Sequence, residues 1–250
     1  ALDRIFPRWR DFANGRPALP IASLTTGGSM QPKQSAYVLL VVISAMSAPT
    51  AWSAEACAPP PGFVDTPHPE LAPIEALLSH TEENTIDQPF HIVVESASRA
   101  SLEDTIDRTS GLPGVVGTYR LTQGKFGPGT RRLVCLTDGS TVVEQVLIQE
   151  QSAGTARFRY VVWNYTSPKF PPISYAIGEF QRTALGDSRT HVRWTYSFQP
   201  NREKNPASAG SHGDAWFRES FLESRFTQWM RKTMANGKKK VDEYAASRTP

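Results

Sequence analysis

The feature that most constrains the fold is a run of β-strands followed by one long helical segment. Between residues 115 and 199, stretches of alternating apolar and polar residues follow one another, separated by turn sequences such as Asp138-Gly139. The period changes at Asp214, from which apolar residues recur every three or four positions to about Tyr244. Strands in direct succession predict an antiparallel sheet, and the amphipathic helix must bury its apolar side against that sheet.

The turn residues place the six strands of this run at 115–122, 130–137, 141–150, 155–165, about 174–184 and 190–199. A further strand is predicted to begin at Phe90, because apolar and polar residues alternate as far as Glu95. Ser101 and Asp104 have capping-box spacing, which predicts a short helix after this first strand. The predicted fold class is α+β: a curved antiparallel sheet of about seven strands wrapped around the C-terminal helix.

Several short motifs follow one another along the predicted sheet. They are Leu112-Pro113-Gly114-Val115-Val116, Gly129-Thr130-Arg131-Arg132, Asp138-Gly139-Ser140 with Glu144, Phe158-Arg159-Tyr160 and Arg193-Trp194-Thr195-Tyr196-Ser197-Phe198-Gln199-Pro200. Together with the C-terminal helix, they resemble the polyketide cyclase/dehydrase branch of the START-type (SRPBCC, helix-grip) superfamily over residues 89–247. The resemblance implies a helix-grip fold with a deep hydrophobic cavity between sheet and helix. It implies no single reaction, because members include ligand carriers, aromatase/cyclases and binding proteins without chemistry.

Strand alternation indicates which side chains would line such a cavity. Along 190–199, one side carries the apolar and aromatic residues Val192, Trp194, Tyr196 and Phe198, so this side is expected to face the helix. Glu144 has the inward parity of its strand, and Arg132 on the preceding strand is the nearest partner for its charge. The predicted ligand-binding residues are Arg132, Glu144, Val146, Phe158, Tyr160, Trp194, Tyr196, Phe198, Phe226, Trp229, Met230 and Thr233.

The role of Glu144, the one candidate catalytic residue, is open at this point. In an apolar pocket its carboxylate would orient a ligand, or act as a general acid/base together with Tyr160 or Tyr196. The alternatives are a structural ion pair with Arg132 and a position in solvent at the strand end. The tyrosines and Trp194 are likewise candidates for core packing with a polar tip.

The N-terminal part of the sequence has the order of a secretory signal peptide over residues 30–56. Lys33 precedes an apolar stretch that runs from Ala36 to about Met46, and small residues then lead to Ala54-Glu55-Ala56. The stretch is shorter than the ~20 residues that cross a bilayer, so no membrane anchor is expected after cleavage. A buried strand is the alternative. The predicted location is the periplasm or the exterior.

The remaining segments follow from these boundaries. Residues 1–29 are expected to be a disordered upstream extension, and 57–88 a proline-rich linker with a short helix near 69–78. Residues 89–250 are predicted to form the helix-grip domain. In an oxidising compartment Cys57 and Cys135 could form a disulfide, or both could remain thiols, because sequence alone does not give their separation.

Charge and motif content narrow the function. A net charge of +3 does not indicate nucleic-acid binding. The histidines lack metal-ligand spacing and no phosphate-binding motif is present, so neither a metal nor a cofactor is predicted. The principal hypothesis is an exported binder or carrier of a hydrophobic small molecule or lipid. The alternatives are a cyclase/aromatase- or dehydratase-like enzyme, and an interaction protein with a filled core.

Overall fold

The computed structural model describes residues 57–109, 111–204 and 210–248 of this chain. The predicted upstream extension at 1–29 and signal peptide at 30–56 lie outside the described residues and stay predictions. In chain order the elements are the 3-10 helix η1 (Ile74–Ala76), β1 (Leu78–Ile86), α1 (Phe90–Arg99), β2 (Val115–Arg120), β3 (Arg131–Leu136), β4 (Thr141–Ser152), β5 (Thr155–Trp163), β6 (Ile173–Leu185), β7 (Arg189–Pro200), α2 (Gly210–Phe217), the π-helix η3 (Arg218–Phe226) and α3 (Thr227–Ala246).

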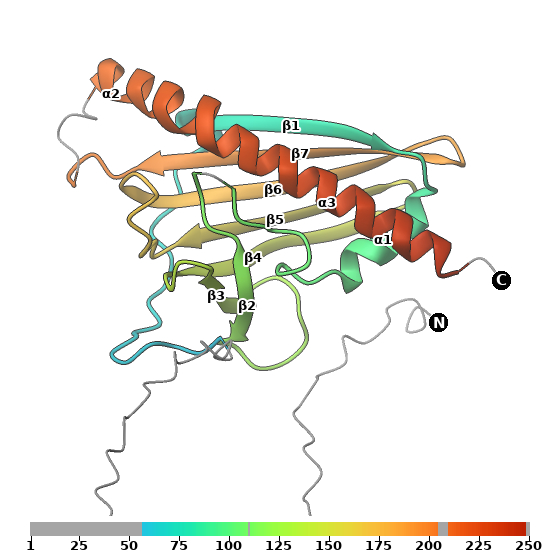
Figure 1. Ribbon diagram of the computed structural model, residues 1–250, viewed down its shortest axis with the longest axis horizontal. Coiled ribbons are helices and arrows are strands. Elements are labelled where there is room, and N and C mark those ends of the chain that lie inside the picture. Colours follow the sequence, from blue (N-terminus) through green and yellow to red (C-terminus); the bar gives the residue numbers. More distant parts are fainter. Residues whose placement is uncertain (1–56, 110, 205–209, 249–250) are drawn as a thin grey trace, which may run out of the picture. The chain divides into compact units, whose positions relative to one another are not determined.

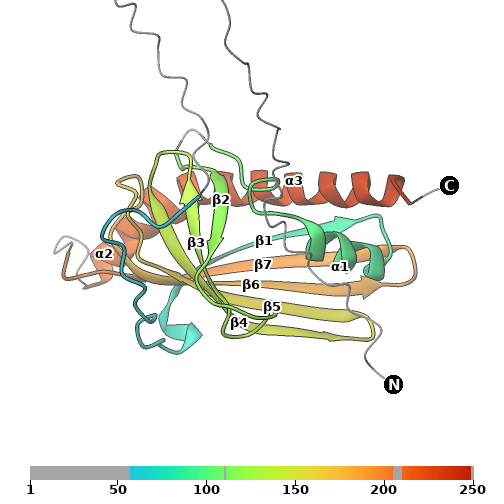
Figure 2. The ribbon, with the colours of Figure 1, turned by 90° about the horizontal axis from the view of Figure 1, so that it is seen from below.

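The strands form one antiparallel sheet of seven in the order β1-β7-β6-β5-β4-β3-β2. Helix α3 runs diagonally across one face of this sheet, and α1 lies beside its C-terminal half (Figure 1). Figure 2 shows the sheet bending so that β2 and β3 turn towards the side on which α3 lies. This is the helix-grip fold, and the predicted fold class is confirmed. We call the sheet face that α3 covers the inner face and the opposite one the outer face.

The first strand is predicted in the wrong place. Residues 90–95 lie in helix α1, and the edge position beside β7 belongs to β1 at Leu78–Ile86. The apolar run after Phe90 favours a strand by propensity, but Pro89 precedes the helix and a helical spacing buries Val93 and Ser96. The sequence of β1 shows no alternation of apolar and polar residues, because the residues between Leu78 and Ile86 are polar on both faces of the strand.

The segment before β1 is not a linker, which corrects the expectation for residues 57–88. Phe63, Leu71 and Ile74 pack on the outer face against a buried cluster that includes Trp163 and Tyr175. The Tyr175 hydroxyl accepts a hydrogen bond from the Ala72 amide at 2.7 Å. Prolines prevent regular structure here without preventing packing. The short helix predicted near 69–78 is reduced to the single turn η1.

A disulfide between Cys57 and Cys135 fastens this segment to β3, with a Cα–Cα distance of 5.7 Å. Of the two alternatives for the cysteines, the structure therefore shows the paired one. After α1, the predicted capping box is present, since the Asp104 amide donates to the Ser101 hydroxyl at 3.3 Å. It closes only a turn and no helix follows, so the short helix after β1 is α1 itself.

The C-terminal helix begins at Gly210, four residues before Asp214, where the helical period begins in the sequence. The Asp214 carboxylate accepts a hydrogen bond from Arg202 at 2.7 Å. α2, η3 and α3 follow one another without a break to Ala246. At the end of the π-helix, the hydroxyl of Thr227, the first residue of α3, donates to the Leu222 carbonyl at 2.6 Å. Within the described part of the chain, no helix has both the length and the apolar character needed to cross a membrane.

Candidate functional site

The inner face divides into two halves, and the half beneath η3 and the start of α3 is a packed core. Phe198 is fully buried there, with its ring centroid 4.8 Å from that of Phe226 and 5.4 Å from that of Phe221. The Phe226 ring in turn stacks on Trp229 at 5.2 Å. Five of the residues predicted to bind a ligand lie in this half and are buried: Phe198, Phe226, Trp229, Met230 and Thr233.

The predicted pair of Glu144 and Arg132 is present on the inner face. The two residues are directly opposite in the register of β3 and β4. The Glu144 Oε1 atom lies 2.6 Å from Nη2 and 2.9 Å from Nε of Arg132. Glu144 is 5% exposed, so this ion pair supplies the charge compensation that a buried carboxylate needs. The other possibility considered above, a carboxylate in solvent at the strand end, is wrong.

Tyrosines surround this pair on the inner side. Burial raises the pKa of Tyr160 and of Tyr196 well above the usual value, and the charge of Glu144 raises both further. Both phenols are therefore hydrogen-bonding groups and not bases at neutral pH. The Tyr160 oxygen accepts a hydrogen bond from the Trp194 indole at 3.1 Å. The buried Tyr165 hydroxyl lies near that of Tyr196 without forming a hydrogen bond of normal geometry.

A glycine makes room for this arrangement. Tyr160 is directly opposite Gly178 in the register of β5 and β6. A Cβ atom at position 178 would lie 2.2 Å from the Tyr160 ring, so the ring occupies the space that any other residue would fill. Val146, on the other side of Tyr160 in the sheet, is buried.

In the second half of the inner face, the inward side chains are partly exposed to solvent. On β5 the inward side chains change from buried at Tyr160 to partly exposed at Phe158 and Ala156. On β6 the same change occurs between Gly178 and the partly exposed Phe180 and Arg182. We call Ala156, Phe158, Phe180 and Arg182 the open end.

Aromatic rings continue from the core to the open end. The Phe180 ring stacks on Trp194 with centroids 4.8 Å apart and ring planes 10° from parallel. Phe158 contacts Tyr160 at 5.6 Å, and Phe126, from the loop between β2 and β3, stacks on Phe158 at 6.3 Å. The open end therefore offers a partly exposed apolar surface that is continuous with the core.

Two residues of this surface, Phe180 and Arg182, are absent from the predicted set. Both have the inward parity of β6, because Phe180 is opposite Trp194 and Arg182 is opposite Val192. Alternation within the predicted strand at 174–184 contains this signal, and anchoring it on the neighbouring strand would have revealed it. Of the predicted residues, Phe158 is part of the open end, and Tyr160 and Trp194 contact it.

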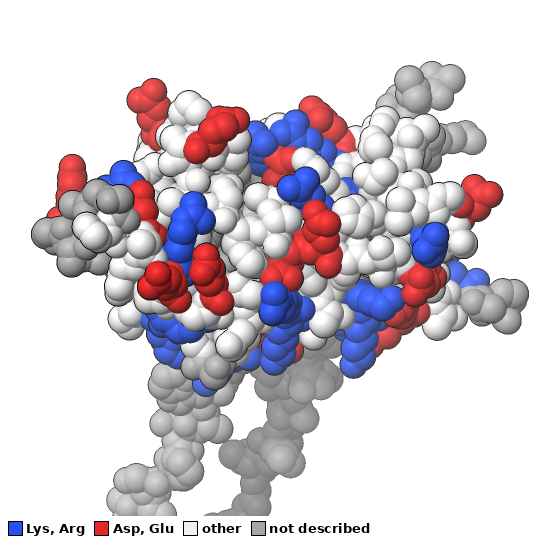
Figure 3. Space-filling model, turned by 90° about the horizontal axis from the view of Figure 1, so that it is seen from above, with Lys and Arg blue, Asp and Glu red and all other residues white. Residues whose placement is uncertain are grey.

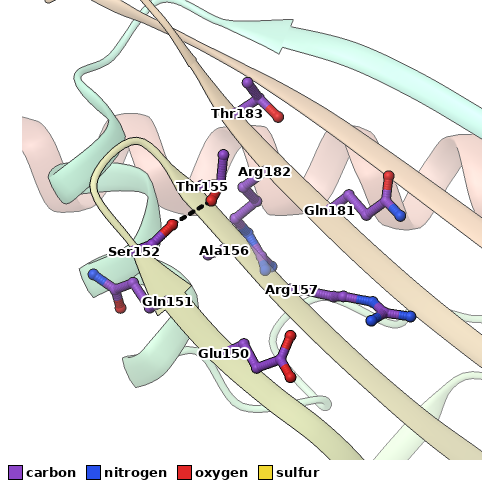
Figure 4. Close-up of a pocket in the computed structure, with 9 residues that line it drawn as sticks. All are labelled: Glu150, Gln151, Ser152, Thr155, Ala156, Arg157, Gln181, Arg182 and Thr183. Carbon is purple, nitrogen blue, oxygen red and sulfur yellow. Dashed lines mark hydrogen bonds between the residues drawn. The ribbon is translucent and has the colours of Figure 1, made fainter.

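The outer face carries a hollow of about 410 Å³ where β4, β5 and β6 approach their hairpin turns. Outward side chains rim it, among them Glu150, Arg157 and Gln181 (Figure 4). Gln151, Ala156 and Arg182, whose side chains have the opposite parity, also line it. Most of the residues that line the hollow are polar or charged, whereas the open end carries the aromatic side chains of Phe158 and Phe180.

Surface charge does not concentrate on the face shown in Figure 3, where acidic and basic side chains are interspersed. Helix α3 also forms ion pairs with the sheet, for example Arg231 with Glu82 at 3.0 Å. The described residues contain no group of three or more metal-ligating side chains.

No protein-family model matches this sequence, and no curated protein does. Among solved structures, the chain is similar to Ara h 8.0201, with 15% identity, a TM-score of 0.46 and coverage of 69% of this chain and 100% of the other. It is similar to the Zhui aromatase/cyclase from Streptomyces sp. R1128, with 14% identity, a TM-score of 0.46 and coverage of 68% and 96%. For norcoclaurine synthase from Thalictrum flavum, in complex with dopamine and hydroxybenzaldehyde, the identity is 10%, the TM-score 0.46 and the coverage 72% and 96%. At these identities and scores, the likeness says nothing about the ligand or the activity of this chain.

Proposed function

We propose that this chain is a binder or carrier of a small, mostly apolar molecule, which it holds against the open end of the inner face. The observation that supports this most directly is the row of inward residues that stay partly exposed at Ala156, Phe158 and Phe180. Elsewhere on the same face, inward apolar side chains are buried beneath η3 and α3. Apolar surface that the fold leaves uncovered at one end of a concave sheet is suited to an apolar ligand.

The packed half of the inner face sets the position of this site. Phe198, Phe221 and Phe226 fill the space under the helix with mutual ring contacts at 4.8–5.4 Å. We therefore propose a ligand at the end of the sheet and not one extending along the whole of the helix. Glu144 serves in this proposal as the structural partner of Arg132 rather than as a general base.

We further propose that the protein is exported. The disulfide between Cys57 and Cys135 supports an oxidising compartment, because such bonds are rare in the cytosol. The predicted signal peptide at 30–56 ends immediately before Cys57, so cleavage there would leave the disulfide intact.

The binding proposal is tested with two tryptophan substitutions at neighbouring positions of β5. Ala156→Trp adds a large ring on the inner side, while Thr155→Trp adds the same ring on the outer side, where Thr155 is exposed. Binding of the neutral apolar dye N-phenyl-1-naphthylamine is measured by fluorescence, and native mass spectrometry of the purified protein detects co-purified apolar molecules. Circular dichroism verifies the fold of both variants.

We expect Ala156→Trp to weaken dye binding about tenfold or more by blocking the site, and Thr155→Trp to leave it unchanged. If Thr155→Trp weakens binding instead, the ligand lies in the outer hollow and the proposed site is wrong. If the unsubstituted protein binds no dye and carries no apolar molecule, the binding proposal is wrong and the alternative of an interaction protein with a filled core is favoured.

A further inference from the structure

Arg182 is the charged member of the open end, and no acidic side chain of the described residues pairs with it. Among the described residues it forms no hydrogen bond and no ion pair, and its contact is with Phe180, whose ring centroid lies 5.0 Å from the guanidinium carbon. By contrast, Arg157 and Arg159 on the outer face of the adjacent strand share the carboxylate of Glu179. Arg157 and Arg159 thus have a carboxylate partner, whereas Arg182 has none among the described residues.

The position of Arg182 is unfavourable for an isolated charge. Burial lowers its pKa to about 10, and no carboxylate acts in the opposite direction. Its neighbours across the strands, Ala156 and Val192, are apolar and offer no hydrogen-bond acceptor in their side chains. Phe180 offers only the face of an aromatic ring, which is a modest substitute for water or an anion.

A second polar group in the same row of the sheet also lacks a partner. Asn84 of β1 is opposite Val192, which is opposite Arg182, so all three point to the inner side. Adjacent strands are about 5 Å apart, which puts the Asn84 and Arg182 backbones about 10 Å from each other. The buried Oδ1 atom of Asn84 has no hydrogen-bond partner in the described structure. Rotating the Asn84 amide by 180° would exchange its two terminal atoms, so that the Nδ2 donor would occupy the position of Oδ1.

We infer that Arg182 anchors the anionic head group of an amphipathic ligand whose apolar body lies on Phe180 and Phe158. The ligand class is a carboxylate with one charged end and an apolar chain or ring system. A guanidinium binds a carboxylate through two parallel hydrogen bonds, and these are stronger in a partly dry site than in water. This inference rests on the proposed binding function and adds the chemistry of the ligand.

The test compares two probes that differ only in the head group, dodecanoate and 1-dodecanol. Their dissociation constants are measured by displacement of N-phenyl-1-naphthylamine from the full chain. The variants are Arg182→Gln, Arg182→Lys and the control Arg193→Gln, which removes an arginine from the outer face of β7, where Arg193 is 50% exposed and pairs with Glu83 at 3.2 Å.

We expect the unsubstituted protein to bind dodecanoate about tenfold or more tightly than dodecanol. Arg182→Gln should abolish this preference by weakening dodecanoate binding far more than dodecanol binding. Arg182→Lys should retain part of the preference, and Arg193→Gln should retain it fully. An equal loss of both probes in Arg182→Gln would assign Arg182 to packing and overturn the inference.

The failure of this inference is distinguishable from failure of the proposed function. Dodecanol binding without any preference for dodecanoate overturns the anionic anchor and leaves the apolar binder in place, whereas absence of binding for both probes overturns both. Thermal unfolding without ligand gives an independent result. Because Arg182 is an unpaired, desolvated cation, Arg182→Gln should unfold at the same or a higher temperature, and a clear decrease would assign it a structural role.

Discussion

At the scale of single residues, the ion pair with Arg132 indicates whether Glu144 has a structural or a catalytic role. Both Arg132 contacts with this carboxylate are shorter than 3 Å, at 2.6 and 2.9 Å. The Glu144 side chain is 7% exposed and the Arg132 side chain 18%. Removing one charge therefore leaves the other in a poorly hydrated place. The geometry therefore favours a structural role for Glu144.

Glu144→Gln is expected to lower the free energy of unfolding by about 2 kcal/mol, because Arg132 loses its counter-charge. Urea unfolding measures this difference. The double variant Glu144→Leu with Arg132→Met removes both charges and should recover most of the stability. A Glu144→Gln protein with unchanged stability would contradict the structural role and favour the enzyme alternative.

The buried tyrosines predict a dependence of stability on alkaline pH. Burial raises the pKa of Tyr160 above the value of about 10 that it has when unfolded, so the folded state holds the phenol proton more tightly. The stabilisation is therefore complete below pH 10 and is lost as pH rises above it, by up to about 1.4 kcal/mol per pH unit for each such tyrosine.

Urea unfolding between pH 8 and about pH 11.5 tests this, with Tyr160→Phe as the comparison. Tyr160→Phe lowers stability at pH 8, because the Trp194 indole loses its acceptor, and it should make the decline above pH 10 less steep than in the unsubstituted protein. Equal slopes in the two proteins would show that Tyr160 titrates normally when folded.

At the scale of elements, two glycines with opposite surroundings provide a matched pair. A Cβ at Gly178 would overlap the Tyr160 ring at 2.2 Å, while a Cβ at Gly237 in α3 meets no atom within 4 Å. Gly178→Ala should therefore lower the free energy of unfolding by about 1–3 kcal/mol, because the Tyr160 ring must move. Gly237→Ala should stabilise by about 0.5–1 kcal/mol, because glycine is a poor helix former.

Thermal unfolding of both alanine variants measures these shifts, and the expected signs are opposite. The combination of Gly178→Ala with Tyr160→Leu should recover part of the loss, since leucine has no ring over β6. If Gly178→Ala is as stable as the unsubstituted protein, Tyr160 does not lie on β6 as described.

Elements with strong local patterns could be predicted from the sequence, and those determined by tertiary packing could not. β3 at Arg131–Leu136 lies within the predicted 130–137, because its apolar residues are bounded by clear turns. α1 was mistaken for a strand because β-branched residues dominate it locally. β1 could not be predicted, because its place in the sheet depends on its pairing with β7 and not on any alternation in its own residues.

The candidate site was predictable to the same extent. The inward parity of Glu144, Phe158 and Tyr160 followed from alternation on single strands and agrees with the structure. Which inward residues are buried and which remain exposed depends on where η3, α3 and α1 end above the sheet, and no strand pattern carries that information. For this reason the sequence did not separate the packed half from the open end.

At the scale of the whole molecule, the described residues form three layers, because the segment from Cys57 to η1 covers part of the outer face, opposite α3. Its attachments include the disulfide to Cys135, a hydrogen bond from the Trp163 indole to the Thr66 carbonyl at 3.2 Å, and apolar packing around Leu71. A cross-link over a sequence separation of 78 residues restricts the unfolded chain strongly.

Removing this cross-link with Cys57→Ser and Cys135→Ser is expected to lower the free energy of unfolding by about 2–4 kcal/mol. Hydrogen exchange should become faster in residues 57–73 and remain slow in β5, whose neighbours on both sides are intact. Unchanged protection of residues 57–73 would mean that packing alone holds the segment, and reduction of the unsubstituted protein provides the same comparison without mutation.

The central claim is that the open end of the inner face holds an amphipathic ligand, and a crystal structure of the protein with 12-bromododecanoate tests it most directly. The bromine is located by its anomalous signal and the carboxylate by its density. We predict the carboxylate at the Arg182 guanidinium and the brominated chain against Phe180 and Phe158. A bromine in the outer hollow beside Arg157, or no bound bromine at saturating ligand, would contradict the claim.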